Sequence, residues 1–265
     1  MRDLSFLKEK ARQLRVDTLD MILKAGSGHI GGSYSIAELL TALYYDKMDL
    51  KTDKFVLSKG HANPILYAVL MDKGIAPKEA KDTLRRYNSI FQGHPDSTKC
   101  PGLDCSTGSL GQGLSVATGM ALGMKKLDLP GMVYVITGDG EIQEGICWEA
   151  FMSANAFKLD NLTVIIDRNR LQLSAPTEET NPLDSVEEKL RSFHFAVDSI
   201  DGHDFEQIFN ALDNVCEGKP HCIVANTVKG KGVSFIENGV KWHGALPAGD
   251  EIAAAYRELG VDYGK

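Results

Sequence analysis

The second half of the chain contains four short, near-continuous apolar runs, and segments with helical spacing lie between them. The runs span Val133–Thr137, Leu162–Asp167, Phe195–Ile200 and Cys222–Val228. Strands that are apolar along both faces are typical of a parallel sheet that helices cover on both sides. Because strands and helices alternate here, we predict an α/β fold with a doubly wound, mostly parallel sheet and helices on both faces.

Helical periodicity accounts for much of the remaining sequence. Gly26 can end a helix over residues 4–25, and Ser35 with Glu38 forms a capping-box pattern ahead of a second helix at Ile36–Tyr45. Further helices are predicted at residues 63–70, 78–87, 144–157, 186–193 (N-cap Ser185), 205–216 (N-cap Asp204) and 251–259, and a short strand at Phe55–Ser58.

Composition and charge exclude several classes of protein. The chain has 29 Lys and Arg against 36 Asp and Glu, a formal charge of −7, which argues against a general nucleic-acid binder. No apolar run reaches the roughly 18 residues of a membrane span. Five cysteines without an export signal predict a cytoplasmic protein with reduced thiols.

No repeat or linker divides the sequence, so we predict one domain over residues 1–265, with an N-terminal helical extension and a short C-terminal tail.

Polar side chains follow two of the predicted strands. Asp139 stands between Gly138 and Gly140 after one strand, and Asn169 follows the next strand along the chain. Ligands of an open parallel sheet bind beyond the carboxyl ends of its strands, and a right-handed crossover would place these two strands side by side. A carboxylate, an amide oxygen and a backbone carbonyl are hard oxygen donors that suit Mg²⁺ and a bound diphosphate.

A glycine-rich segment, Thr107–Gly113, opens a helix of small residues. The free backbone N–H groups at the start of such a helix, together with its dipole, form an anion site. The glycine order is G-x-x-G-x-G, which differs from the G-x-G-x-x-G of dinucleotide-binding proteins. A dinucleotide-dependent dehydrogenase is therefore disfavoured.

Four histidines lie beside glycine in predicted loops: His29, His61, His94 and His243. Their shared setting predicts a polar pocket that binds hydroxyl groups and moves protons near neutral pH. A fifth, His203, stands just before a helix, and we interpret its segment as a structural turn.

Together these segments resemble the N-terminal, diphosphate-binding part of transketolase, the thiamine-diphosphate enzyme that transfers two-carbon ketol units between sugar phosphates. The resemblance runs through nearly the whole chain, and the histidine loops are its most specific part. The matching segments are residues 27–29, 53–62, 93–95, 108–113, 138–145, 167–171, 229–232 and 242–244.

The resemblance implies roles for individual residues. Asp139, Asn169 and the backbone carbonyl of Leu171 would hold Mg²⁺, or Ca²⁺ or Mn²⁺ in its place. The implied contacts to the cofactor come from His61, Gly108, Ser109, Leu110, Gly140, Asn169, Lys229 and His243. The implied contacts to the donor and acceptor sugars come from His29, His61, His94 and His243. Glu144 matches a glutamate at the family's subunit boundary that communicates between active sites.

The resemblance also implies a partner. Transketolases continue into a pyrimidine-binding domain and a further C-terminal domain, whereas this sequence ends at Lys265. We therefore expect the N-terminal subunit of a split transketolase, active only with a separately encoded C-terminal subunit, in an α2β2 heterotetramer. Its substrates would be a ketose phosphate donor and an aldose phosphate acceptor, with no nucleic acid and no membrane involved.

The sequence leaves three alternatives open. The chain could belong to another thiamine-diphosphate enzyme, either half of a deoxyxylulose-phosphate synthase or the α-subunit of a 2-oxo acid dehydrogenase. The histidine loops disfavour the dehydrogenase, and an assay with pyruvate separates both from a transketolase. The third alternative is a non-catalytic module that binds the cofactor and regulates a partner, which the retained polar residues disfavour.

Overall fold

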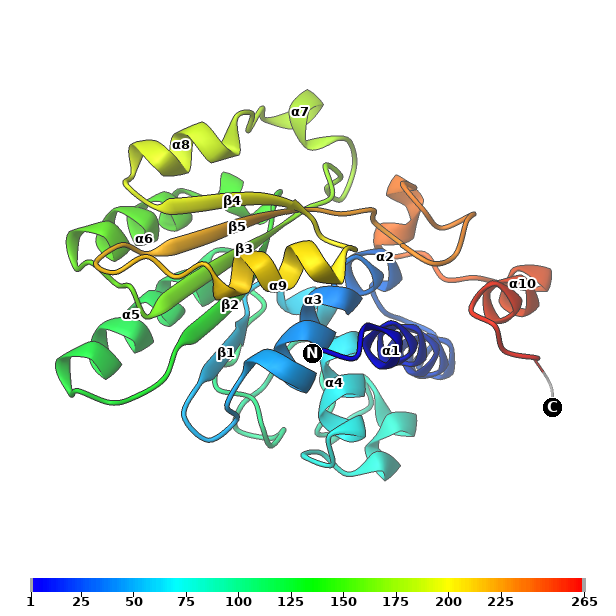
Figure 1. Cartoon of the computed structure of the whole chain (residues 1–265). Helices are drawn as coiled ribbons and strands as arrows, with labels where there is room; N and C mark the ends of the chain where they lie inside the picture. Colours follow the sequence, from blue (N-terminus) through cyan, green and yellow to red (C-terminus); the bar gives the residue numbers. More distant parts are fainter. Residues whose placement is uncertain (1, 264–265) are drawn as a thin grey trace.

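A single five-stranded sheet forms the centre of the computed structural model, which describes residues 2–263 (Figure 1). The order of the strands is β1-β2-β3-β5-β4, and every pair is parallel. The strands are β1 (Lys54–Leu57), β2 (Val133–Gly138), β3 (Leu162–Arg168), β4 (Ala196–Asp201) and β5 (His221–Asn226). The predicted parallel α/β sheet is therefore confirmed. The last predicted strand extended too far, because β5 ends at Asn226 and residues 227–228 already belong to the loop that follows.

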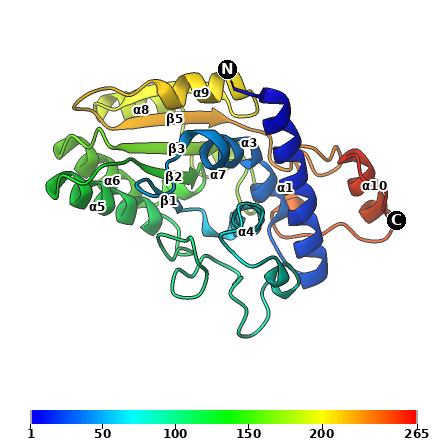
Figure 2. The same cartoon turned by 60° about the horizontal axis from the view of Figure 1, so that its bottom comes forward.

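Helices cover both faces of the sheet, and the alternation of side chains along β2 shows how (Figure 2). Val133 and Val135 point to one face, where they pack with α5 (Gln112–Lys126), α6 (Gly145–Ala156) and α8 (Val186–Ser192). Tyr134 and Ile136 point to the opposite face and join the larger core. The helices of that core are α1 (Leu4–Ala25), α3 (Ala37–Ala42), α4 (Asn63–Asp72) and α9 (Phe205–Asp213). Burial on both faces explains why the central strands β2 and β3 are largely apolar, whereas β4, at the edge of the sheet, is mostly half-buried or exposed and carries polar residues.

Several helix ends follow the predicted chemistry. α1 ends at Gly26, whose φ of 64° is the left-handed conformation that glycine adopts readily. The side chain of Ser185 accepts a hydrogen bond from the amide of Glu188, and Asp204 accepts from the first amides of α9. These N-caps are confirmed. The predicted helix at residues 78–87 is wrong in extent, because only a 3₁₀ segment at Lys78–Thr83 forms there.

The capping box predicted at Ser35 and Glu38 is wrong. The chain forms a short helix, α2 (Ile30–Tyr34), and α3 then starts without a side-chain cap. Ser35 instead donates its hydroxyl to Asp167 on β3, 2.8 Å away. Glu38 forms a buried ion pair with Arg15 of α1 at 2.7 Å. Both side chains therefore bind partners that are distant in sequence instead of capping the helix.

The segment after β5 returns to the N-terminal helices. It forms a 3₁₀ turn, Val240–His243, that packs on α2, and it ends in α10 (Asp250–Glu258) beside α1 (Figure 1). Arg12 of α1 donates to the carbonyl of Leu259 at 2.5 Å, which ties the end of α10 to α1. The path brings residues 229 and 243 to the same end of the molecule as α2. Within residues 2–263, no helix is long and apolar enough to span a membrane.

Candidate functional site

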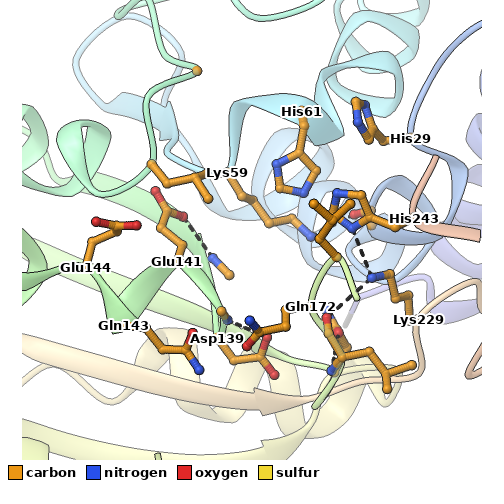
Figure 3. A pocket seen from close by; sticks show the side chains of 18 of the residues that line it. His29, Lys59, His61, Asp139, Glu141, Gln143, Glu144, Gln172, Lys229 and His243 are labelled. Atoms are coloured by element: carbon orange, nitrogen blue, oxygen red, sulfur yellow. Dashed lines mark hydrogen bonds between the residues drawn. The ribbon is translucent and has the colours of Figure 1, made fainter. Parts of the chain in front are cut away.

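A cavity of about 400 Å³ opens at the carboxyl ends of β1, β2 and β3 (Figure 3). Most of the residues that the resemblance implicated line this cavity. They are His29, His61, His94, Gly108, Leu110, Asp139, Gly140, Glu144, Asn169, Leu171, Lys229 and His243. Ser109 is exposed in the loop before α5 and is not among the lining residues, so the cavity gives no support to its predicted contact with the cofactor.

Asp139 and Asn169 lie at neighbouring strand ends, because β2 and β3 pair with Gly138 opposite Asp167. The carboxylate of Asp139 is 2% exposed and accepts hydrogen bonds from the amides of Gly140 (2.8 Å) and Arg170 (2.5 Å). Burial, with the nearby charge of Asp167, raises the pKa of Asp139 to about 6. The carboxylate is thus held at the cavity wall by two amides and by an ion pair with the buried guanidinium of Arg168, 3.3 Å away.

The amide of Asn169 is oriented by its neighbours. Its Nδ2 donates to Asp167 at 2.8 Å, and its Oδ1 accepts from the amide of Leu171 at 3.1 Å. The carbonyl of Leu171 accepts from Lys229 at 3.3 Å. Buried Oε1 of Gln172 has no hydrogen-bond partner among the described residues, although Gln172 lines the cavity.

These oxygens fit a divalent cation bound together with a diphosphate. No cluster of three or more His, Cys, Asp or Glu that could hold a metal occurs within residues 2–263, so a cage built from carboxylates is absent there. Mg²⁺ is usually held by one or two carboxylates and completes its shell with water and phosphate oxygens. One carboxylate with an amide and a carbonyl oxygen matches that pattern, and the unpaired Oε1 of Gln172 offers a further acceptor.

Two buried lysines line the same cavity, each 2% exposed. Lys59 donates to Asp167 at 2.5 Å and to the carbonyl of Gly32 at 2.7 Å. Lys229 donates to the carbonyl of Leu171 and to Nδ1 of His243 at 3.2 Å, but it forms no ion pair with a carboxylate of the described residues. Burial, with the charge of Lys59, lowers the pKa of Lys229 to about 8. A buried ammonium group without a carboxylate favours an anionic ligand.

Three of the histidines form a cluster. The ring centroids of His29, His61 and His243 are 5.1–5.3 Å apart, and the three rings gather on the side of the cavity away from Glu144 (Figure 3). Burial, reinforced by nearby cations, lowers the pKa of His29 and of His243 to about 4 and that of His61 well below 6.5. Burial and the neighbouring cations therefore favour the neutral form of all three rings at pH 7, against the expectation that they titrate near neutral pH. His94 stands apart, with its ring against Gly108.

Sequence reasoning missed two buried residues that line the cavity, Glu141 and Lys59. Glu141 is 2% exposed and joins the segment after β1, the loop before α5 and the end of β2: its carboxylate accepts from the hydroxyl of Ser58 (2.5 Å) and from the amides of Gly111 (2.9 Å) and Gly138 (3.0 Å). Lys59 was also missed, because its burial depends on α2 passing over it. The only sequence signal for Glu141 was its place directly after Gly138–Gly140.

The glycine-rich loop is held close to β1. Gly111 precedes α5 with a φ of 83°, and a Cβ at Gly113 would lie 2.6–2.8 Å from the backbone and side chain of Ser58. Only glycine permits this approach, which sets the start of α5 against the end of the strand. The expected helix start at this glycine-rich segment is confirmed.

The fold and the cavity define an α/β protein with a polar cavity at the carboxyl edge of its parallel sheet, the place where such sheets bind their ligands. The family model described as "Transketolase, thiamine diphosphate binding domain" matches residues 7–265. The chain therefore belongs to the transketolase family, in its thiamine diphosphate-binding domain, and the resemblance drawn from the sequence is confirmed.

Individual relatives agree with this assignment. The chain is 43% identical to the 6-deoxy-6-sulfo-D-fructose transketolase subunit of Clostridium sp. (strain MSTE9), over 96% of both chains. It is 41% identical to an apulose-4-phosphate transketolase subunit of Phocaeicola vulgatus, over 96% of this chain and 93% of that protein. The crystal structure of Campylobacter jejuni transketolase superimposes with a TM-score of 0.92 at 33% identity, covering all of this chain but 44% of that one. The chain thus spans less than half the length of such single-chain transketolases.

Proposed function

We propose that this chain is the cofactor-diphosphate-binding subunit of a two-chain transketolase. The enzyme transfers a two-carbon ketol unit from a ketose phosphate to an aldose phosphate. One observation carries the proposal: three kinds of group line the same cavity. They are the oxygens of Asp139, Asn169 and Leu171, the ammonium group of Lys229, which has no carboxylate partner among the described residues, and the histidine cluster. The relatives that match nearly the whole chain are themselves named as transketolase subunits, which supports a separate partner.

In this proposal, Asp139, Asn169 and the carbonyl of Leu171 hold Mg²⁺. Lys229 neutralises part of the charge of the diphosphate, and the glycine-rich loop with Gly140 forms the wall beside it. When bound, thiamine diphosphate supplies the nucleophilic carbon and the electron sink for breaking a bond next to a carbonyl group. The chain's own residues bind, orient and shield it from water.

The histidines serve the sugars. His29, His61 and His243 form one wall of the cavity, and His94 adds a fourth ring near Gly108. As neutral imidazoles they donate and accept hydrogen bonds without adding charge, which suits the hydroxyl and carbonyl oxygens of a ketose. Glu144 is exposed at the rim of the cavity, where it would face another subunit.

The rim favours a partner chain. Leu173 is 69% exposed and Leu110 is 36% exposed, and both line the cavity. A partner that covers this rim buries their apolar surface and closes the site over the cofactor. We propose that this partner is a C-terminal transketolase subunit, that the assembly is an α2β2 heterotetramer and that it works in the cytoplasm.

Reconstitution tests the proposal. The purified chain is mixed with a candidate C-terminal subunit, and ketol transfer is measured with thiamine diphosphate and Mg²⁺. We expect ketol transfer from the mixture and none from either chain alone; full activity of this chain alone would refute the two-chain assignment. A parallel assay with pyruvate as donor distinguishes a deoxyxylulose-phosphate synthase from a transketolase.

A further inference from the structure

The contact between Arg85 and His29 determines which ring nitrogen of His29 carries the proton. The Nη2 of Arg85 lies 3.2 Å from Nδ1 of His29, and its Nη1 donates to the hydroxyl oxygen of Ser27 at 2.6 Å. A guanidinium group has donors only and stays charged in proteins, so the ring nitrogen that it contacts must be the acceptor. Nδ1 of His29 is therefore without a proton, and a neutral ring then carries its proton on Nε2.

We propose that Arg85 is a positioning residue that holds His29 as its neutral Nε2–H tautomer, so that His29 serves a bound sugar as a hydrogen-bond donor and not as a base. The first half concerns this chain alone. The second half rests on the proposed function, because it assigns the oxygen that receives the hydrogen bond to a sugar substrate.

The backbone around Arg85 supports a dedicated role for this side chain. Arg85 has a φ of 60°, a conformation that costs a non-glycine residue about 1 kcal/mol or more. A Cβ at Gly93 would lie 3.3 Å from Nε of Arg85, so this glycine leaves room for the guanidinium. The strained backbone at Arg85 and the small residue at Gly93 thus both allow the guanidinium to reach His29.

The charge of Arg85 is not used elsewhere in the described structure. Within residues 2–263 its side-chain hydrogen bonds go to Ser27 and His29 and to no carboxylate, and its buried Nε has no hydrogen-bond partner. An arginine that only stabilised this loop would be expected to meet a carboxylate or backbone carbonyls. Its guanidinium instead contacts Ser27 and His29, both at the edge of the cavity.

The remainder of the surroundings keeps His29 neutral. Burial and then the positive charge of Arg85 lower the pKa of His29 to about 4, so the ring carries a single proton at pH 7. Nε2 has no hydrogen-bond partner among the described residues, while His29 lines the cavity. The N–H of Nε2 can donate to a carbonyl oxygen or to a hydroxyl oxygen, and this hydrogen bond strengthens as negative charge develops on that oxygen. Because Nε2 is already protonated, it cannot act as a base toward the ligand.

Nitrogen NMR of the full chain reads the tautomer directly. The chain is labelled with ¹⁵N in its histidines, and long-range ¹H–¹⁵N correlations distinguish a bare, pyridine-type nitrogen from a protonated, pyrrole-type one. The variant H29N identifies the signals of His29. We expect a pyridine-type Nδ1 and a pyrrole-type Nε2 in the unsubstituted chain without any cofactor or partner.

Three variants test whether Arg85 is the cause. R85M keeps the length of the side chain without a donor, so the two nitrogens of His29 should move toward averaged shifts as both tautomers become populated. R85K retains a cation and should restore much of the fixed pattern. R86M removes the neighbouring, exposed arginine and should leave the pattern of His29 unchanged.

The possible results decide the proposal. A pyrrole-type Nδ1, two pyrrole-type nitrogens at pH 7, or an R85M spectrum identical to the parent overturns the role of Arg85, and the first two can be read even if R85M fails to fold. If the spectra are as expected but the reconstituted enzyme shows no ketol transfer, the proposed function fails while the tautomer stands. If ketol transfer is found and R85M leaves its rate unchanged, the donor role of His29 toward the sugar is overturned.

Discussion

The carboxylate of Glu141 joins the segment after β1, the loop before α5 and the end of β2, and removing it is the most informative test of how the site is built. E141A leaves the amides of Gly111 and Gly138 and the hydroxyl of Ser58 without their partner. Each buried polar group that loses its partner costs about 1–3 kcal/mol. Water that enters the new space recovers part of this loss, so we expect the free energy of unfolding to fall by about 3 kcal/mol. That is a large share of the roughly 5–15 kcal/mol of an ordinary domain.

E141Q refines the test. Glutamine keeps an acceptor for Ser58 and Gly111, but its NH₂ group meets the amide of Gly138, which is also a donor. We expect a smaller loss of about 1–2 kcal/mol, because a single buried donor loses its acceptor. Urea unfolding followed by circular dichroism measures both variants, with E179Q, at an exposed position on the helix Thr177–Thr180, as the matched control. The reasoning is refuted if E141A unfolds within about 0.5 kcal/mol of the parent chain, the range of ordinary surface substitutions.

Three further predictions follow from the cavity. D139A should abolish Mg²⁺-dependent binding of thiamine diphosphate in calorimetry, whereas H94A should retain binding and lose turnover in the reconstituted enzyme; equal affinity of D139A and the parent contradicts the metal assignment. K229M should weaken the binding of thiamine diphosphate at least tenfold and leave the stability of the fold nearly unchanged. An unchanged Kd would show that the charge of Lys229 does not contribute to binding. His29 and His243 have a pKa of about 4 when folded against 6.5 when unfolded, so the unfolded chain binds more protons between these values. Stability should therefore be full above pH 6.5 and decline as the pH falls toward 4, and a profile from H29N that declines as steeply as the parent's would contradict this.

The sheet could be predicted because its signal is local. Four runs of apolar residues are long enough for strands, and burial on both faces requires no particular partner for each side chain. The same logic placed Asp139 and Asn169 together, since parallel strands in sequence order bring their carboxyl ends to one edge. The capping box at Ser35 and Glu38 failed for the opposite reason: Arg15 and Asp167, distant in sequence, compete for those side chains and offer stronger, buried partners.

The charges beneath the cavity could not be predicted, because a buried ion depends on partners from several elements. Asp167 illustrates this. Burial alone would raise its pKa, but Lys59 and hydrogen bonds from Thr227 and Ser35 outweigh that cost and hold the pKa below its usual value. These partners come from the segment after α2, the loop after β1 and the loop after β5, so no window of sequence contains the motif. Arg85 is a similar case, since its partner His29 lies 56 residues away.

The two buried lysines show how such a network divides its charges. Lys59 is balanced by Asp167 at 2.5 Å, so its charge already serves the fold. Lys229 lies in the same cavity, and among the described residues its hydrogen bonds go to a carbonyl and an imidazole nitrogen, which are neutral acceptors. An ammonium group buried without an anion is costly, and a protein retains it where a ligand supplies the missing charge. Leaving Lys229 without a carboxylate costs the fold free energy, and a bound diphosphate would recover that free energy. Lys59 could attract a diphosphate only by weakening its ion pair with Asp167.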